Sequence, residues 1–164
     1  MKRLILMRHA KSDWSTAAQT DHARPLNPRG RRSATALGNW LRKNKYRPDE
    51  ILCSDAMRTR ETLIGLTLGE VPTRFTRDLY LAEPEAMAAA LRHCTQDCIL
   101  MVAHNPGSAM LAGMLLDQPP PHSEFATYPT CATLVADFGI HSWDKLAFHS
   151  GTPVDFVVPR DLIK

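Results

Sequence analysis

Short apolar runs alternate with longer segments of helical periodicity along this 164-residue chain. A run of a few apolar residues bounded by turn-forming residues predicts a buried strand, and apolar residues three and four positions apart predict an amphipathic helix. The expected strands are Lys2–Met7, Ile51–Cys53, Arg74–Thr76 and Cys98–Ala103. The expected helices are Arg29–Lys43, Met57–Leu68, Pro84–Arg92 and an apolar segment that follows Gly107 and runs to about Leu116.

The rest of the chain completes this alternating order. Residues 12–27 are polar and proline-containing and predict a loop, as does the run Pro119-Pro120-Pro121. Thr133–Phe138 and Lys145–Phe148 predict a late hairpin at a sheet edge, and the pattern after Thr152 indicates no particular element. Strands that alternate with helices predict a three-layer α/β/α fold with a mostly parallel central sheet. The length suits a single domain that spans residues 1–164.

Composition excludes several classes of function. The apolar fraction of 44%, the charged fraction of 23% and the net charge of +3 are those of an ordinary globular protein. The basic residues are not gathered among aromatic ones, so nucleic acid is not an expected partner. The apolar run after Lys2 and Arg3 is too short for a signal peptide, and no run reaches transmembrane length. We therefore expect a cytoplasmic protein without a membrane partner, and a monomer by default.

Two small clusters have ordinary structural interpretations. The four cysteines show no pairing pattern, and His93, Cys94 and Cys98 lack a second ligand pair at zinc-like spacing. Reduced thiols and no metal site are therefore expected. Arg29, with Arg31 and Arg32, is expected on the solvated face at the start of a helix.

Arginine and histidine follow three of the expected strands. Arg8 and His9 directly follow the first strand, Arg58 follows the second by a few residues, and His104 directly follows Cys98–Ala103. The carboxyl ends of parallel strands meet at one edge of a sheet, where ligands of such folds bind. Helix N-termini at that edge favour an anion. Two arginines and two imidazoles suit a phosphoryl group, since guanidinium groups bind its oxygens and an imidazole can attack phosphorus.

Four motifs carry a family resemblance. They are Arg8-His9-Ala10, the segment Leu26-Asn27-Pro28-Arg29-Gly30, the segment from Ser54 through Arg58 to Thr62, and His104-Asn105-Pro106. In this order they resemble the motifs of the histidine phosphatase (phosphoglycerate-mutase-like) superfamily. Ala10 replaces the usual glycine, and the opening Arg-His-Ala resembles the SixA-like phosphohistidine phosphatase branch.

The resemblance implies a role for each matching residue. His9 resembles the histidine that becomes transiently phosphorylated, and Arg8, Arg58 and His104 resemble the rest of the phosphate pocket. Ser15 falls where many members place an asparagine that touches phosphate. The implied chemistry needs neither a metal ion nor a cofactor.

The general acid of the family has no clear counterpart. Glu83 is the best candidate by its order along the chain, with Asp13 and Asp21 as weaker ones, but Glu83 equally fits a carboxylate at the start of a helix. An alkyl phosphate needs such an acid, worth about 10²–10⁴-fold, because its leaving group is an alkoxide. A phosphohistidine whose free ring nitrogen is protonated expels neutral imidazole and needs less help.

The spacing between Glu83 and His104 leaves no room for the capping region that mutase-type members insert there. An open pocket without a large cap domain suits a bulky substrate. We therefore expect a metal-independent phosphatase that works through a phosphohistidine intermediate on His9 and acts on protein phosphohistidine. A phosphatase of small phosphorylated metabolites and a non-catalytic phosphate-binding module are the alternatives.

Overall fold

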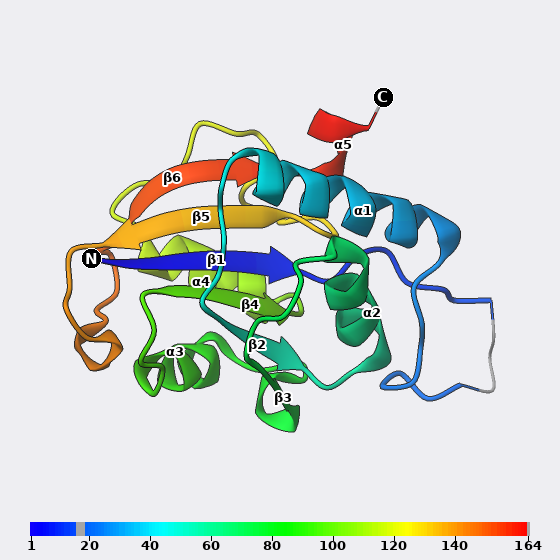
Figure 1. Ribbon diagram of the computed structural model, residues 1–164, viewed down its shortest axis with the longest axis horizontal. Coiled ribbons are helices and arrows are strands. Elements are labelled where there is room, and N and C mark those ends of the chain that lie inside the picture. Colours follow the sequence, from blue (N-terminus) through cyan, green and yellow to red (C-terminus); the bar gives the residue numbers. More distant parts are fainter. Residues whose placement is uncertain (16–18, 164) are drawn as a thin grey trace.

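A six-stranded sheet in the order β3-β2-β4-β1-β5-β6 forms the centre of the molecule (Figure 1). The computed structural model describes residues 1–15 and 19–163. Within these residues, β5 is antiparallel to both of its neighbours and the other strands share one direction, which confirms the mostly parallel sheet. The strands are β1 (Lys2–Arg8), β2 (Glu50–Ser54), β3 (Thr73–Thr76), β4 (Cys98–Ala103), β5 (Thr133–Phe138) and β6 (Thr152–Val157).

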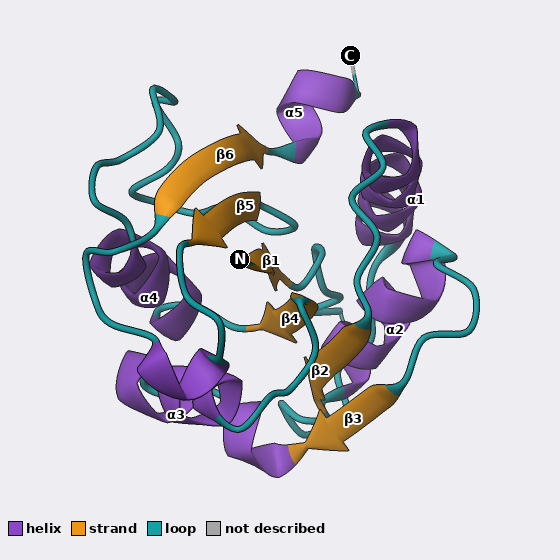
Figure 2. Cartoon of the chain, turned by 60° about the vertical axis from the view of Figure 1, so that its left-hand side comes forward, coloured by secondary structure: helices purple, strands orange, loops and turns teal. Residues whose placement is uncertain are grey.

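Helices cover both faces of the sheet and give the three predicted layers (Figure 2). α1 (Pro28–Lys43) and α2 (Met57–Leu66) lie on one face, and α3 (Pro84–Arg92) and α4 (Gly107–Leu115) lie on the other. Short 3-10 turns occupy Arg77–Leu79 and Trp143–Lys145, and the short helix α5 (Pro159–Leu162) follows β6. Across the described part of the chain, each helix is too short or too polar to cross a bilayer.

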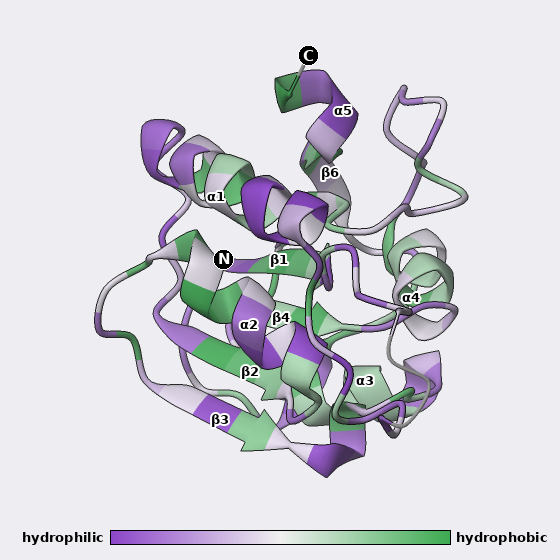
Figure 3. Cartoon of the chain, turned by 90° about the vertical axis from the view of Figure 1, so that its right-hand side faces the viewer, coloured by the Kyte–Doolittle hydropathy of each residue, from purple (hydrophilic) through white to green (hydrophobic). Residues whose placement is uncertain are grey.

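The central strand β1 is buried on both of its faces. Leu4 and Leu6 pack into the layer formed by α3 and α4, whereas Ile5 and Met7 pack into the layer formed by α1 and α2. All four side chains are fully buried. A strand covered on both sides has apolar residues at successive positions, which explains the unbroken run in the sequence. Figure 3 views the molecule from the side toward which β1, β2 and β4 point. The hydrophobic residues of these strands lie behind loops that contain many hydrophilic residues.

Of the two strands of the predicted late hairpin, the first is confirmed and the second is wrong. Thr133–Phe138 is a strand, but it lies between β1 and β6 rather than at the edge. Lys145–Phe148 is not a strand, because the preceding turn buries Trp143, whose indole N–H donates to the carbonyl oxygen of Gln96 at 2.7 Å. Its place is taken by β6, an edge strand that accommodates Pro153 because an edge does not need every backbone N–H.

The four cysteines are free thiols, as the sequence predicts. Cys53 and Cys131 are buried, and burial raises the pKa of each thiol to about 12. These residues therefore fill the core as protonated side chains.

Candidate active site

A cavity of about 360 Å³ at the carboxyl ends of the parallel strands brings together Arg8, His9, Arg58 and His104. Arg8 is the last residue of β1 and His9 follows it, Arg58 lies in the first turn of α2, and His104 follows β4. The centroids of the two imidazole rings are 5.2 Å apart. The remaining residues that line the cavity are Lys11, Ser12, Trp14, Asp21, Arg24, Leu81, Asn105 and Thr130.

The imidazole of His9 has a defined tautomer. Its Nδ1 lies 2.7 Å from the carbonyl oxygen of Ala10. A carbonyl oxygen accepts and cannot donate, so Nδ1 carries the proton and Nε2 keeps its lone pair. The Arg58 Nε–H lies 3.4 Å from His9 Nε2. Nε2 is therefore the unprotonated nitrogen of the ring, and it accepts this long hydrogen bond from Arg58.

The environment of His9 keeps the ring neutral. Burial lowers the pKa of His9 to about 3, and the charges of Arg58, Arg8 and Arg24 act in the same direction. The hydrogen bond to Ala10 opposes this shift without cancelling it. A neutral imidazole at pH 7 is the nucleophilic form.

His104 is held by the hydroxyl of Ser54, which lies 2.8 Å from its Nε2. When this hydroxyl donates to Nε2, the ring proton resides on Nδ1, which is buried and has no partner among the described residues. Burial is the main cause that lowers the pKa of His104 to about 3, and the positive charge of Arg58 acts in the same direction. In this tautomer His104 keeps one ring N–H donor that no described residue accepts.

The third motif, from Ser54 through Arg58 to Thr62, has a structural reason for its spacing. Arg58 and Thr62 are four residues apart on α2 and therefore share one helix face. Arg58 is almost fully buried, and its guanidinium donates to the carbonyl oxygen of Asp21 at 2.7 Å and to its carboxylate at 3.1 Å. The Thr62 hydroxyl accepts the backbone N–H of Ala10 at 2.9 Å and donates to the Arg58 carbonyl oxygen at 2.7 Å.

The glycine of the Leu-Asn-Pro-Arg-Gly segment is required by a close approach. The Asn27 side chain caps α1 and accepts the backbone N–H of Gly30 at 2.7 Å. A Cβ on Gly30 would overlap the carbonyl oxygen of Lys11. The start of α1 therefore packs directly on the segment that follows His9.

A third arginine, Arg24, completes the cavity and was not predicted. Its side chain is 7% exposed and donates to Ser12 Oγ and, at 2.9 Å, to the Asp21 carboxylate. The ring of Trp14 lies 3.5 Å from the Arg24 guanidinium carbon. Arg24 belongs to the loop of residues 12–27, where no periodicity predicts the direction of a side chain.

Asp21 connects the arginines of the cavity. Burial acts to raise the pKa of its carboxyl, but hydrogen bonds from Tyr80 and Arg24, together with the charge of Arg58, lower it well below its usual range. Asp21 is therefore ionised, and it holds Arg24 and Arg58 in place.

Ser15 and Glu83 are not among the described residues that line the cavity. Ser15 is exposed, and its backbone N–H donates to Asp13 at 2.8 Å. Glu83 is exposed at the N-cap of α3, where its side chain accepts no capping hydrogen bond. A phosphate contact by Ser15 and an acid role for Glu83 stay predictions.

Residues 128–132, which lead into β5, hold Arg8 and His9 from the other side. The Cys131 N–H donates to the His9 carbonyl oxygen at 2.9 Å, and the Arg8 side chain donates to the Tyr128 carbonyl oxygen at 3.2 Å. Tyr128 and Cys131 adopt positive φ angles of 51° and 64°. Strained backbone of this kind is typical of functional sites.

Comparisons with known proteins agree with this geometry. A model of the histidine phosphatase superfamily (branch 1) matches residues 4–80. An uncharacterized protein of Mycobacterium leprae is 34% identical over 163 residues, which cover 94% of this chain and 100% of that protein. The chain belongs to the histidine phosphatase superfamily.

Solved structures place the fold more narrowly. The structure of a candidate phosphohistidine phosphatase SixA from Nakamurella multipartitia has a TM-score of 0.85 and 28% identity, and the match covers 96% of each chain. The protein histidine phosphatase SixA complexed with tungstate has a TM-score of 0.80 and 21% identity, with 98% of this chain and 99% of that chain covered. The fold is SixA-like, and membership of the superfamily supports a phosphatase activity.

Proposed function

We propose that the chain is a single-domain phosphatase that transfers a phosphoryl group through His9 and acts on phosphohistidine in proteins. The observation that carries this proposal is a set of three buried nitrogens without a partner among the described residues: Arg8 Nε, Arg24 Nε and His104 Nδ1. All three belong to side chains that line the cavity into which His9 faces. Buried donors are normally satisfied, so unpaired nitrogens on three side chains that line one cavity favour an oxyanion as the missing acceptor.

The geometry supports a two-step displacement. His9 Nε2 attacks phosphorus, and the bond from phosphorus to the leaving nitrogen breaks as the new N–P bond forms. The electron pair of the broken bond leaves with the imidazole of the substrate. Water then attacks phosphorus and gives up a proton to solvent; the bond from phosphorus to His9 Nε2 breaks, its electron pair returns to the ring, and inorganic phosphate leaves. Arg8, Arg58 and His104 offset the charge on the phosphoryl oxygens throughout.

The leaving group supports phosphohistidine as the substrate. The carboxylate that lines the cavity, Asp21, is held ionised by two arginines and is a poor proton donor. Glu83 is exposed outside the lining. A site without a ready acid hydrolyses substrates whose leaving group departs as a neutral molecule. The names of the SixA neighbours point to the same substrate class.

Phosphate release tests the proposal. We would compare a phosphohistidine-bearing protein with p-nitrophenyl phosphate, using wild type and His9→Ala in the presence of a chelator. We expect turnover that resists the chelator, favours the phosphoprotein and falls by at least about 10³-fold in His9→Ala. His141→Ala is the matched control, because His141 is exposed.

Each other outcome selects an alternative. Turnover of small esters without turnover of the phosphoprotein would favour a metabolite phosphatase. Phosphate binding without any turnover would favour a non-catalytic binding module. Full activity in a folded His9→Ala variant would refute His9 as the nucleophile.

A further inference from the structure

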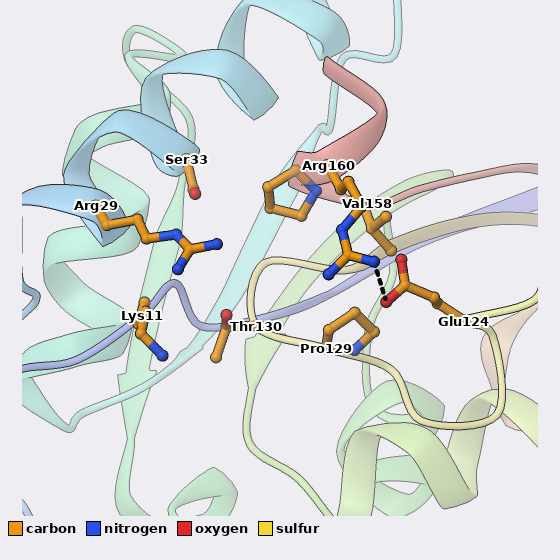
Figure 4. A pocket seen from close by; sticks show the side chains of 9 residues that line it. Lys11, Arg29, Ser33, Glu124, Pro129, Thr130, Val158 and Arg160 are labelled. Carbon is orange, nitrogen blue, oxygen red and sulfur yellow. Dashed lines mark ion pairs between the residues drawn. The ribbon is translucent and has the colours of Figure 1, made fainter. Parts of the chain in front are cut away.

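A second, smaller cavity of about 120 Å³ adjoins the cavity that contains His9 (Figure 4). Lys11 and Thr130 line both cavities, so they form the wall between them. The start of α1 and the start of α5 form the other sides. We call this second cavity the cationic groove; its lining consists of Lys11, Arg29, Ser33, Glu124, Pro129, Thr130, Val158, Pro159 and Arg160.

The groove has an excess of positive charge. Three of its side chains are cationic and one, Glu124, is a carboxylate. The charged ends of Lys11 and Arg29 form no ion pair or hydrogen bond with any of the described residues. Arg160 pairs with Glu124 at 4.0 Å, but its side chain is 82% exposed. Such a pair is worth little in water, so an incoming anion displaces it at small cost.

Arg29 occupies a position that usually favours an acidic residue. It lies in the first turn of α1, which contains no acidic side chain, next to the positive end of the helix dipole. The nearby arginines lie outside the groove. Arg31 donates to the Leu26 carbonyl oxygen at 3.1 Å, and the side chain of Arg32 is exposed. Only Arg29 of these three lines the groove, where it points toward Thr130 (Figure 4).

The backbone holds Arg29 opposite Lys11. Gly30 packs against the Lys11 carbonyl oxygen, and the backbone N–H of Asn27 donates to the same oxygen at 3.0 Å. The segment that carries Thr130 is tied to His9 by the hydrogen bond from Cys131. The groove is therefore fixed relative to the nucleophile, as a specificity site has to be.

We propose that the cationic groove binds a carboxylate of the protein substrate that lies close to the phosphorylated side chain. This inference rests on the proposed phosphatase function. The guanidinium of Arg29 has the planar pair of donors that matches a carboxylate, and the hydroxyls of Ser33 and Thr130 add further donors. The cavity volume corresponds to about four water molecules of liquid, which accommodates one carboxylate group. The enzyme is expected to prefer phosphorylated segments that contain Asp or Glu beside the phosphoryl group.

Matched phosphohistidine peptides test this preference. Two sets of peptides carry Glu or Gln at one of the positions flanking the phosphohistidine, and kcat/KM is measured for each. We expect wild type to favour the best Glu peptide over its Gln partner by about 3- to 10-fold, as two exposed charge contacts allow. The Arg29→Gln/Arg160→Gln double variant should lose this preference and keep its rate on p-nitrophenyl phosphate, which has no second anion.

Arg32→Gln is the matched control, because it removes the same charge from α1 outside the groove. Retention of the Glu preference in Arg32→Gln supports a local site. Equal kcat/KM for Glu and Gln peptides in wild type would overturn the proposal, and so would an equal loss of preference in Arg32→Gln. A preference confined to small compounds with two phosphates would also overturn it.

Binding distinguishes this proposal from the proposed function. If wild type releases phosphate from no peptide, the phosphatase assignment fails, and fluorescence anisotropy of labelled peptides with His9→Ala then decides on the groove. Tighter binding of the Glu peptide, weakened by the additional Arg29→Gln and Arg160→Gln changes, would support the groove. Equal affinity for both peptides, or affinity for neither, would overturn it.

Discussion

The hydroxyl of Thr62 accepts the backbone N–H of Ala10, the residue that follows the nucleophile. The same hydroxyl donates to the Arg58 carbonyl oxygen. One buried threonine on α2 thus connects the segment that carries His9 to the helix turn that carries Arg58. Ala10 in turn accepts the proton of His9 Nδ1. The orientation of the His9 imidazole therefore depends on α2 as well as on the sheet.

Thr62→Val is expected to weaken this arrangement. The substitution keeps the shape of the side chain but leaves the buried Ala10 N–H without an acceptor, which costs about 1–3 kcal/mol. We expect a lower free energy of unfolding in urea and a lower kcat. Thr35→Val is the control, because Thr35 is exposed and its hydroxyl bonds within α1. Equal stability of the two variants would contradict the role given to Thr62.

Gly30→Ala and Gly113→Ala are expected to act in opposite directions. A Cβ at position 30 overlaps the Lys11 carbonyl oxygen, whereas one at position 113 in α4 meets nothing within 4 Å. We expect Gly30→Ala to destabilise the fold by about 1–3 kcal/mol through overpacking. Gly113→Ala should stabilise it by up to about 1 kcal/mol through helix propensity. Chemical denaturation of both variants checks this, and a neutral Gly30→Ala would contradict the close approach.

Stability is expected to fall as the pH drops below 6.5. His9 and His104 have native pKa values of about 3, whereas an unfolded histidine has a pKa of about 6.5. Between these values the unfolded chain binds more protons, so acid favours unfolding; above pH 7 both states are neutral and the effect vanishes. Each group contributes at most about 1.4 kcal/mol per pH unit.

Urea unfolding between pH 4.5 and 7 measures this dependence above the range in which Asp21 titrates. His104→Gln should make the slope shallower, because one of the two groups is removed. The exposed His141→Gln variant should keep the wild-type slope. A wild-type slope of zero in this window would contradict neutral, buried imidazoles.

Arg24→Gln is expected to lower kcat/KM by about 10- to 100-fold, the worth of one charge-assisted hydrogen bond to the phosphoryl group. Arg60→Gln provides a matched arginine two residues from Arg58. Arg60 donates to the Asp55 carbonyl oxygen at 2.9 Å and stacks on Phe75, outside the cavity lining. Steady-state measurement of kcat/KM for both variants tests whether Arg24 binds the phosphoryl group. Similar rates for the two variants would exclude Arg24 from phosphate binding.

The identity of the general acid is decided by two carboxylate variants. If Glu83 protonates the leaving group, Glu83→Gln lowers the rate on phosphoserine much more than the rate on phosphohistidine. Asp21→Asn is expected to lower both rates together, because Asp21 positions Arg24 and Arg58 rather than donating a proton. Parallel losses in Glu83→Gln would contradict the acid role, and a loss confined to phosphoserine in Asp21→Asn would transfer that role to Asp21.

The predictability of the fold followed burial. β1 and β4 are covered on both faces, and their unbroken apolar runs predict them to within one residue. β6 is a half-exposed edge strand that contains Pro153, so its composition argues against a strand although its position permits one. The Lys145–Phe148 segment is the opposite case: its composition resembles that of a strand, but the segment begins in a 3-10 turn and does not join the sheet.

The site residues at the ends of buried strands could be predicted from the sequence, whereas those on a loop could not. Arg8, His9 and His104 sit at strand ends, whose location the apolar runs indicate, and parallel topology then brings them together. Arg24 and Asp21 reach the cavity from a loop, and no pattern specifies the path of a loop. The departure at Ala10 is accommodated because its φ is not in the positive region that favours glycine.

Two backbone hydrogen bonds connect the end of β1 to the segment before β5: the Cys131 N–H donates to the His9 carbonyl oxygen, and the Arg8 N–H donates to the Ala132 carbonyl oxygen. They pair residues that are more than 120 positions apart with the backbone of Arg8 and His9. A nascent chain that has reached Gly107 contains every motif of the family, yet it still lacks the segment that closes the nucleophile from the side of β5. A chain that stops short of Tyr128 therefore contains the four motifs but lacks the backbone groups that hold Arg8 and His9 from the side of β5.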